Sequence, residues 1–113
     1  MEDCLFCKIA AGQIPSNKLY EDDQILAFYD IDPQAPVHFL VIPKKHIPSA
    51  AALTEADGAL LGHIFATIAK LCNDLGCEGG WRVVSNVGAD AGQSVPHLHF
   101  HVMAKRPMGW PAG

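Results

Sequence analysis

The chain has 113 residues, of which half are apolar and 18% are charged, and its net charge is −4. A chain of this length is expected to form one domain, residues 1–113, with a real hydrophobic core. The acidic balance argues against a surface that binds nucleic-acid polymers. No run of about 18 apolar residues suggests a membrane span, and the acidic start does not resemble a signal peptide. We therefore expect a cytoplasmic protein whose four cysteines are thiols or metal ligands.

The residue pattern in the first third of the chain predicts one short helix and two short strands. Residues 4–11 form the helix, which Gly12 ends. Residues 18–21 and 25–29 form the strands, and the polar residues 22–24 form the turn between them.

The next elements are a strand, a long helix and a further strand. The apolar, β-branched run 37–43 predicts a strand that ends at its proline. An apolar stripe with spacings of one, three and four residues predicts a helix from Thr54 to about Leu75, with Thr54 and Asp57 in a capping arrangement. Residues 81–85 form the next strand, and the pattern as a whole predicts an antiparallel sheet with its helices on one face.

The last segment of the chain, residues 97–103, has histidine at every second position. In an extended strand His97, His99 and His101 would lie on one face, with the intervening apolar residues on the other face against a core. A neutral imidazole can act as a nucleophile, a base or a metal ligand. His38 lies on another apolar strand, where a lone histidine is usually a hydrogen-bonded core residue unless the triad is its neighbour.

A glycine-rich loop, residues 86–96, comes directly before the histidines. Glycine-rich loops are more often plain turns, but backbone N–H groups can also form a concavity that holds an anion. Asn86 and Ser94 could add side-chain donors, and the absence of a Gly-Lys-Ser/Thr ending excludes a Walker-type loop. Asp30, at the end of a strand, could accept both hydroxyls of a ribose or simply cap a turn.

The pair Cys4 and Cys7 has Cys-x-x-Cys spacing, for which three interpretations compete. A redox pair lacks the expected preceding strand pattern. A tetrahedral zinc site would need two more ligands, for which His46 and His97 are the best candidates. The third interpretation is a pair of buried thiols that pack a short helix.

These residues together resemble the histidine triad (HIT) family, and specifically its nucleotide-binding phosphoramidase branch. The match is carried by His97-x-His99-x-His101 with apolar residues between and after the histidines. It extends over most of the chain, through these further segments: Ile14-Pro15, residues 28–31, residues 35–46, residues 92–95, and Gly109-Trp110-Pro111. The resemblance implies an α+β, HIT-like fold with a five-stranded antiparallel sheet, one long helix and a short N-terminal helix.

The resemblance also implies the chemistry. His99 would attack the phosphorus of a purine nucleoside phosphoramidate, and water would release AMP or GMP from the nucleotidyl-histidine. His101 and Ser94 would contact the phosphate or the leaving group, and His38 would support them. Asp30 and Ile31 would contact the ribose, and Asn86, Gly92 and Gln93 would surround the phosphate. The purine would lie against these apolar residues: Leu5, Phe6, Ile9, Ile14 and Phe28.

The resemblance requires no cofactor for the chemistry, but bacterial relatives with this N-terminus hold a structural zinc. Its ligands here would be Cys4, Cys7, His46 and His97, so that His97 would be an anchor rather than an acid or base. The implied assembly is a homodimer in which the tail, about residues 105–113, brings Trp110 near the partner's site.

Three other activities stay open. One is dinucleoside polyphosphate hydrolysis by the same residues, and another is a nucleotide-binding scaffold with incidental activity. The third is a zinc hydrolase in which His97, His99 and either His101 or His38 hold a catalytic metal.

Overall fold

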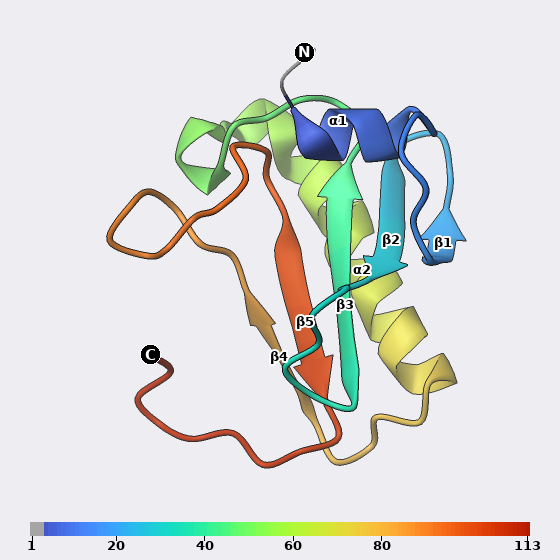
Figure 1. Ribbon diagram of the computed structural model, residues 1–113, viewed down its shortest axis with the longest axis vertical. Helices are drawn as coiled ribbons and strands as arrows, with labels where there is room; N and C mark the ends of the chain where they lie inside the picture. Colours follow the sequence, from blue (N-terminus) through green and yellow to red (C-terminus); the bar gives the residue numbers. More distant parts are fainter. Residues whose placement is uncertain (1–3) are drawn as a thin grey trace.

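The computed structural model describes residues 4–113, whose centre is a five-stranded antiparallel sheet (Figure 1). The strands are β1 (Lys18–Glu21), β2 (Ile25–Tyr29), β3 (Val37–Pro43), β4 (Trp81–Val84) and β5 (Phe100–Ala104). Their order across the sheet is β1-β2-β3-β5-β4, so that β5 lies beside the central β3 although more than fifty residues separate them. The α+β fold with this five-stranded sheet, one long helix and one short helix is confirmed.

Two α-helices pack on this sheet. The long helix α2 (Gly58–Asp74) follows two 3₁₀ turns, Ala50–Ala52 and Glu55–Asp57, so the predicted helix begins with a tighter turn. The predicted cap is present, because the Thr54 N–H donates to the Asp57 carboxylate at 3.0 Å. The short helix α1 (Leu5–Ala10) has Cys4 at its N-cap, where Sγ accepts a hydrogen bond from the Cys7 N–H.

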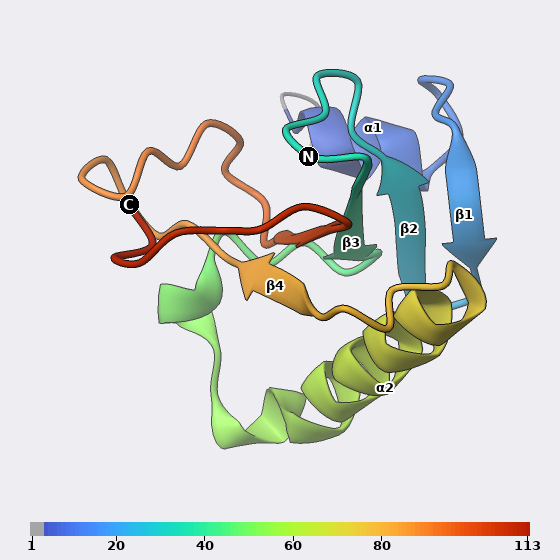
Figure 2. The same cartoon turned by 90° about the horizontal axis from the view of Figure 1, so that it is seen from below.

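The prediction that the helices lie on one face of the sheet is wrong. Figure 2 shows α1 and α2 on opposite sides of the sheet. On the α2 side, alternate residues of β2, β3 and β5 form the larger core, which includes Phe39 and Val41. On the α1 side, the residues in between, such as Leu40 and Ile42, form a smaller core with Phe6 and Ile9.

The sequence signal for this arrangement is the continuous apolar run of β3. All seven residues of β3 are buried, as expected for a strand covered on both faces and not for one that faces water. His38 is part of that run and faces the α1 side with Leu40, because alternate side chains of a strand share a face.

The histidine segment was predicted to be a strand over residues 97–103, but the strand begins only at Phe100. His97, Leu98 and His99 precede the ladder, and the Leu98 N–H donates instead to the Ile47 carbonyl at 2.6 Å. One cause is Pro96, which has no N–H to donate. In addition, the His97 carbonyl accepts a hydrogen bond from the His99 ring at 2.7 Å. The alternation of faces still holds, since Leu98, Phe100 and Val102 all enter the larger core.

Candidate functional site

The His99 ring is held in one orientation by its own backbone. Its Nδ1 lies 2.7 Å from the His97 carbonyl oxygen, which can only accept, so Nδ1 carries the proton and donates it. The lone pair of the neutral ring is therefore on Nε2, which has no hydrogen-bond partner within residues 4–113. His99 is 4% exposed as a residue, and its ring packs edge-on against Phe6 of α1, with centroids 4.9 Å apart. This arrangement fixes the lone pair on Nε2 of a buried ring.

A second pair of histidines lies beside it and has a fixed proton order. The Gln34 backbone N–H donates to Nδ1 of His38 at 3.0 Å, so the neutral His38 ring carries its proton on Nε2. That Nε2 is 3.0 Å from Nδ1 of His101, which must then accept. The remaining proton of the neutral His101 ring is consequently on its Nε2. The rings of His99 and His101 are 5.1 Å apart between centroids, which brings the donor and the nucleophile to one place.

Burial keeps these rings in their neutral form. Desolvation lowers the pKa of both His38 and His101 below the usual histidine value. Neighbouring histidines lower the pKa of His101 further, whereas the Asp30 carboxylate acts in the opposite direction on both rings. Asp30 Oδ2 is 3.4 Å from His38 Nε2 and 3.8 Å from His101 Nδ1. Its other oxygen accepts from the Asp32 N–H in a turn at the end of β2.

Several polar groups of the loop of residues 86–96 are hydrogen-bonded within the loop or to residues beside it. The Gly92 and Gln93 N–H groups donate to carbonyls of Ala89 and Gly88, and the Gln93 side chain bonds Gly88, Pro48 and Val95. These residues shape the loop, with Gly88 and Gly92 at φ 78° where glycine is favoured. Ser94 is exposed, and neither its N–H nor its hydroxyl has a hydrogen-bond partner within residues 4–113. Ser94 is thus a donor of this loop that is open to a phosphate, and Asn86 is half-buried nearby in sequence.

The residues predicted to contact the base come from α1 and the strand beneath it. Phe6, Ile9 and Phe28 are buried in the smaller core, with Ile14 packed against it. Phe6 also contacts Phe28 edge-on at 5.7 Å. Leu5, which was also predicted to contact the base, is 44% exposed, and Ile31, which was predicted to contact the ribose, is fully exposed. Their apolar surfaces are available to a ligand.

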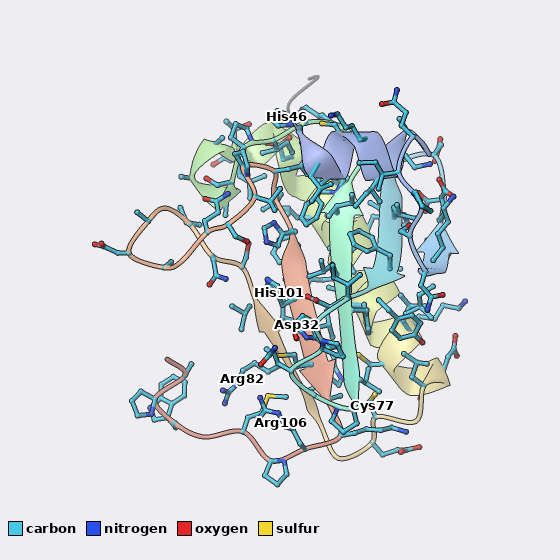
Figure 3. The ribbon with its side chains drawn as sticks, viewed as in Figure 1. Asp32, His46, Cys77, Arg82, His101 and Arg106 are labelled. Carbon is cyan, nitrogen blue, oxygen red and sulfur yellow. The ribbon has the colours of Figure 1, made fainter. Side chains whose placement is uncertain are left out.

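Four metal-ligating groups converge at the start of α1. The Nδ1 of His97 is 3.2 Å from Cys4 Sγ, 3.4 Å from Cys7 Sγ and 3.2 Å from Nδ1 of His46. Cys7 Sγ is in turn 3.2 Å from Nδ1 of His46. The four residues form one potential metal-binding group, which agrees with the set predicted from the sequence. Figure 3 shows His46 beside α1, with His101 further along the sheet.

The donor set and spacing fit a tetrahedral zinc. With Zn–S of about 2.3 Å and Zn–N of about 2.05 Å, two tetrahedral N ligands lie about 3.3 Å apart and an N and an S ligand about 3.6 Å apart, close to the N–N and N–S distances found. The Nε2 of His97 donates to the Pro43 carbonyl at 2.8 Å, which leaves Nδ1 as a lone pair for a metal. Burial and Cys4 raise the pKa of the Cys7 thiol to about 11, so a cation would have to displace its proton.

The zinc-hydrolase alternative is not supported by this geometry. Within the described residues, His97, His99 and His101 form no common metal-binding group, because the His97 ring faces the two cysteines. Nδ1 of His99 donates a hydrogen bond to the His97 carbonyl. A second potential group does exist, Asp30 with His38 and His101, but His38 and His101 there bond each other directly.

The C-terminal tail folds back along its own chain. The Arg82 guanidinium donates to the Gly109 carbonyl at 2.9 Å, and Trp110 beyond it is 86% exposed. Arg106 donates to the Gln34 carbonyl at 2.8 Å and so ties the tail to the loop beside His38. Figure 3 shows both arginines near this tail.

Several residues that shape the site were not found by sequence reasoning. Ser85 donates its hydroxyl to the His99 carbonyl at 2.9 Å, and the carbonyl of Pro43 orients His97. Gln34 orients His38 through its backbone N–H. Backbone donors and acceptors carry no residue-type signal, so only the proline-rich loop around Gln34 hinted at a fixed conformation.

Comparison with known proteins defines the protein family. The HIT domain matches residues 11–108, and the chain belongs to that family. It is 49% identical over 112 residues to an uncharacterized HIT-like protein of Synechocystis, covering 99% of this chain and 98% of the relative.

Solved structures agree with this assignment. A HIT family hydrolase from Legionella pneumophila superposes with a TM-score of 0.96 at 48% identity, covering 98% of this chain and all of the other. A histidine triad protein from Clostridium difficile gives 0.92 at 45% identity, covering 96% of each chain. No helix within residues 4–113 has the length and apolar character needed to cross a bilayer.

Proposed function

We propose that this chain is a nucleotide hydrolase that cleaves the P–N bond of purine nucleoside phosphoramidates through a covalent intermediate on His99. The observation that carries the proposal is the fixed tautomer of His99, whose Nδ1 proton is held by the His97 carbonyl so that Nε2 presents a lone pair. Solved relatives from Legionella pneumophila and Clostridium thermocellum are HIT family hydrolases, which supports this class of reaction.

In the first half-reaction, Nε2 of His99 forms a bond to phosphorus while the P–N bond breaks. The amine leaves neutral because the reacting substrate carries a proton on its bridging nitrogen. The Nε2–H of His101 and the hydroxyl of Ser94 donate to the phosphoryl oxygens, where negative charge increases. Asp30 binds the ribose, and Phe6, Ile9, Ile14 and Phe28 pack against the purine.

In the second half-reaction, water attacks the nucleotidyl-histidine. The P–O bond forms, the P–Nε2 bond breaks, and one proton of the water passes to solvent, which balances the proton that the substrate brought in. His99 returns to its starting tautomer because Nδ1 keeps its proton throughout. Covalent catalysis thereby replaces one difficult displacement with two easier ones.

No cofactor takes part in these steps. We propose that Cys4, Cys7, His46 and His97 hold a structural zinc, which would cross-link α1 to the sheet and supply no chemistry at phosphorus. The proposed setting is a reducing cytoplasm, in agreement with four free cysteines. The proposed assembly is a homodimer in which the Trp110 tail lies near the partner's site.

The test is release of AMP from adenosine 5′-phosphoramidate by the purified protein. We expect turnover that His99→Ala abolishes, whereas His63→Gln, on the opposite side of the sheet, retains it. Parallel assays with diadenosine tetraphosphate test the family alternative. Cleavage of that substrate alone would replace the phosphoramidase proposal, and full activity in His99→Ala would refute covalent catalysis. Tight AMP binding without turnover of either substrate would favour a scaffold.

A further inference from the structure

His97 belongs to two sites at once. Its ring Nδ1 lies among the sulfur and nitrogen atoms of Cys4, Cys7 and His46, while its backbone carbonyl accepts the Nδ1 proton of His99. Its Nε2 is bonded to the Pro43 carbonyl, and the residue is completely buried. The position of His97 therefore affects both the geometry of the Cys4, Cys7 and His46 cluster and the orientation of the His99 ring.

The short helix α1 makes a second connection between the same two sites. Cys4 caps α1 and Cys7 lies in its first turn. Between them in sequence, the Phe6 ring packs edge-on against both His99 and His97, at centroid distances of 4.9 and 6.1 Å. A helix of six residues is too short to be stable by itself in water. The location of Phe6, and with it one wall around His99, depends on what anchors α1.

Without a cation, the hydrogen-bonding atoms of the cluster of Cys4, Cys7, His46 and His97 do not all have partners. Three groups, Cys4 Sγ, Cys7 Sγ and Nδ1 of His46, all lie within 3.2–3.4 Å of the single lone pair on His97 Nδ1. The Cys4 thiol can donate its proton to His97 and the Cys7 thiol its proton to His46, which leaves the two Nδ1 lone pairs 3.2 Å apart with no proton between them. A tetrahedral divalent cation gives each of the four atoms a partner simultaneously.

We infer that the cluster of Cys4, Cys7, His46 and His97 positions the nucleophile. Its occupancy by a tetrahedral divalent cation controls which nitrogen of His99 carries the proton and where α1 packs on the sheet. This inference builds on the proposed function, in which His99 attacks phosphorus. It differs from a purely structural metal, since a structural metal would stabilise the whole fold without a particular effect on His99 or Phe6.

Two measurements without substrate test the inference. The first is the ¹⁵N NMR tautomer of His99 in protein loaded with Zn²⁺ and in protein after chelation. The second is amide hydrogen exchange of α1 relative to α2. With zinc, His99 is expected as the Nδ1–H form with α1 protected. After chelation, the two His99 tautomers should interconvert, and α1 exchange should rise about tenfold or more while α2 is unchanged. Addition of Zn²⁺ alone should restore both.

Activity gives an independent third readout. Chelation should lower kcat for adenosine 5′-phosphoramidate by about 10- to 100-fold, the range seen when groups that orient a reacting residue are lost. His46→Gln, which removes a ligand but no reacting group, should behave like chelated protein at low Zn²⁺. Cys72→Ala is the matched control, because Cys72 is a buried cysteine of the other core. It should lower stability without changing the His99 tautomer.

The possible outcomes separate this inference from the proposed function. An unchanged His99 tautomer and unchanged α1 exchange after chelation would overturn the inference even if the enzyme turns over. Equal loss of protection in α1 and α2 would also overturn it, because the metal would then act on the whole fold. Failure to bind one Zn²⁺ per chain, or to give the tetrahedral Co²⁺ spectrum, would do the same. Absence of turnover with a zinc-dependent tautomer would refute only the proposed function.

Discussion

At the residue scale, the site depends on hydrogen bonds that fix which nitrogen of each ring carries a proton. A backbone carbonyl does so for His99, and the Gln34 N–H does so for the His38–His101 pair. Imidazole chemistry requires this because each neutral ring has one donor and one acceptor nitrogen. The triad is thus three histidines with three different tasks rather than three equivalent ones.

Arg106 offers a test of the His38–His101 pair. Its guanidinium holds the Gln34 carbonyl, and its charge is one cause of the lowered pKa of His38. In Arg106→Gln we expect the pKa of His38 to rise toward its usual value and kcat/KM to fall about two- to tenfold. NMR titration of His38, which also faces Asp30, Asp32 and His101, provides the pKa.

Arg82→Gln is the matched control for that variant. Arg82 donates to the Gly109 carbonyl of the same tail but is not among the groups that shift the pKa of His38. An equal change in the pKa of His38 in both arginine variants would contradict a specific role for Arg106 and would indicate a general effect of the tail.

The buried histidines also predict how stability depends on pH. The pKa values of His38 and His101 are lowered in the folded chain, whereas unfolded histidine titrates near pH 6.5. Below about pH 6.5 the unfolded chain takes up protons that the folded chain does not, so stability falls as the pH drops. Above that pH these groups contribute no slope.

Urea unfolding between pH 8 and pH 5 checks this prediction. His101→Gln, which removes one of the histidines with a lowered pKa, should show a shallower loss of the unfolding free energy on acidification than the parent chain. Identical slopes for the two proteins would contradict the assignment of the slope to His101.

At the scale of elements, the β1–β2 turn is fastened to α2 by one carboxylate. Asp22 accepts hydrogen bonds from the Gln24 and Ile25 N–H groups and from Tyr20, and it pairs with His63 of α2 at 2.6 Å. These donors hold the pKa of Asp22 well below its usual value although partial burial opposes them.

We predict that Asp22→Ala destabilises the fold by about 1–3 kcal/mol, because two backbone donors of the turn lose their acceptor. Urea unfolding measures the loss, and Asp23→Ala next to it is the matched control. The His99 tautomer should be unchanged, since Asp22 lies by α2 on the opposite side of the sheet. A loss equal to that of Asp23→Ala would show that the fastening contributes nothing.

Elements with a simple local signal were predicted well from the sequence. The strands β1, β2 and β3 lie at the predicted residues because polar turns and a proline bound them. The start of the histidine strand was misplaced, since the bond from the Leu98 N–H to the Ile47 carbonyl leaves no trace in the residue pattern. The side on which α1 packs was also missed, although the unbroken apolar run of β3 contained that information.

In the candidate site too, features with a signal in the sequence were predicted and features that depend on the backbone path were not. Cys4, Cys7, His46 and His97 come together as expected, because ligand types and spacing are visible in a sequence. The internal bonding of Gly92 and Gln93 could not be foreseen, since it depends on the path of the loop backbone. Roles in binding and catalysis for these and the other site residues remain predictions.

At the scale of the whole molecule, one edge of the sheet is flanked by apolar surface. The edge strand is β4, where Trp81 is 41% exposed (Figure 2). Trp81 and Ala69 of α2 line the same hollow, and Phe65, one turn earlier on α2, is 43% exposed. An open strand edge beside apolar side chains favours pairing with a second copy.

We therefore predict that Trp81→Glu shifts the mass in solution from two chains toward one. Light scattering after size-exclusion chromatography over a concentration series measures this. Lys18→Ala on the opposite edge strand β1 is the control and should leave the mass unchanged. A single-chain mass for the unaltered protein at every concentration would contradict the proposed dimer.

Because every residue of β3 is covered, neighbouring positions of this strand sample separate environments. Phe39 faces the core beneath α2, while Leu40 belongs to the core beneath α1. A fluorine label at position 39 would follow global unfolding, and one at position 40 would follow events around the histidines. Adjacent residues of one strand thus provide a pair of spectroscopic probes that distinguishes local loosening from loss of the whole fold.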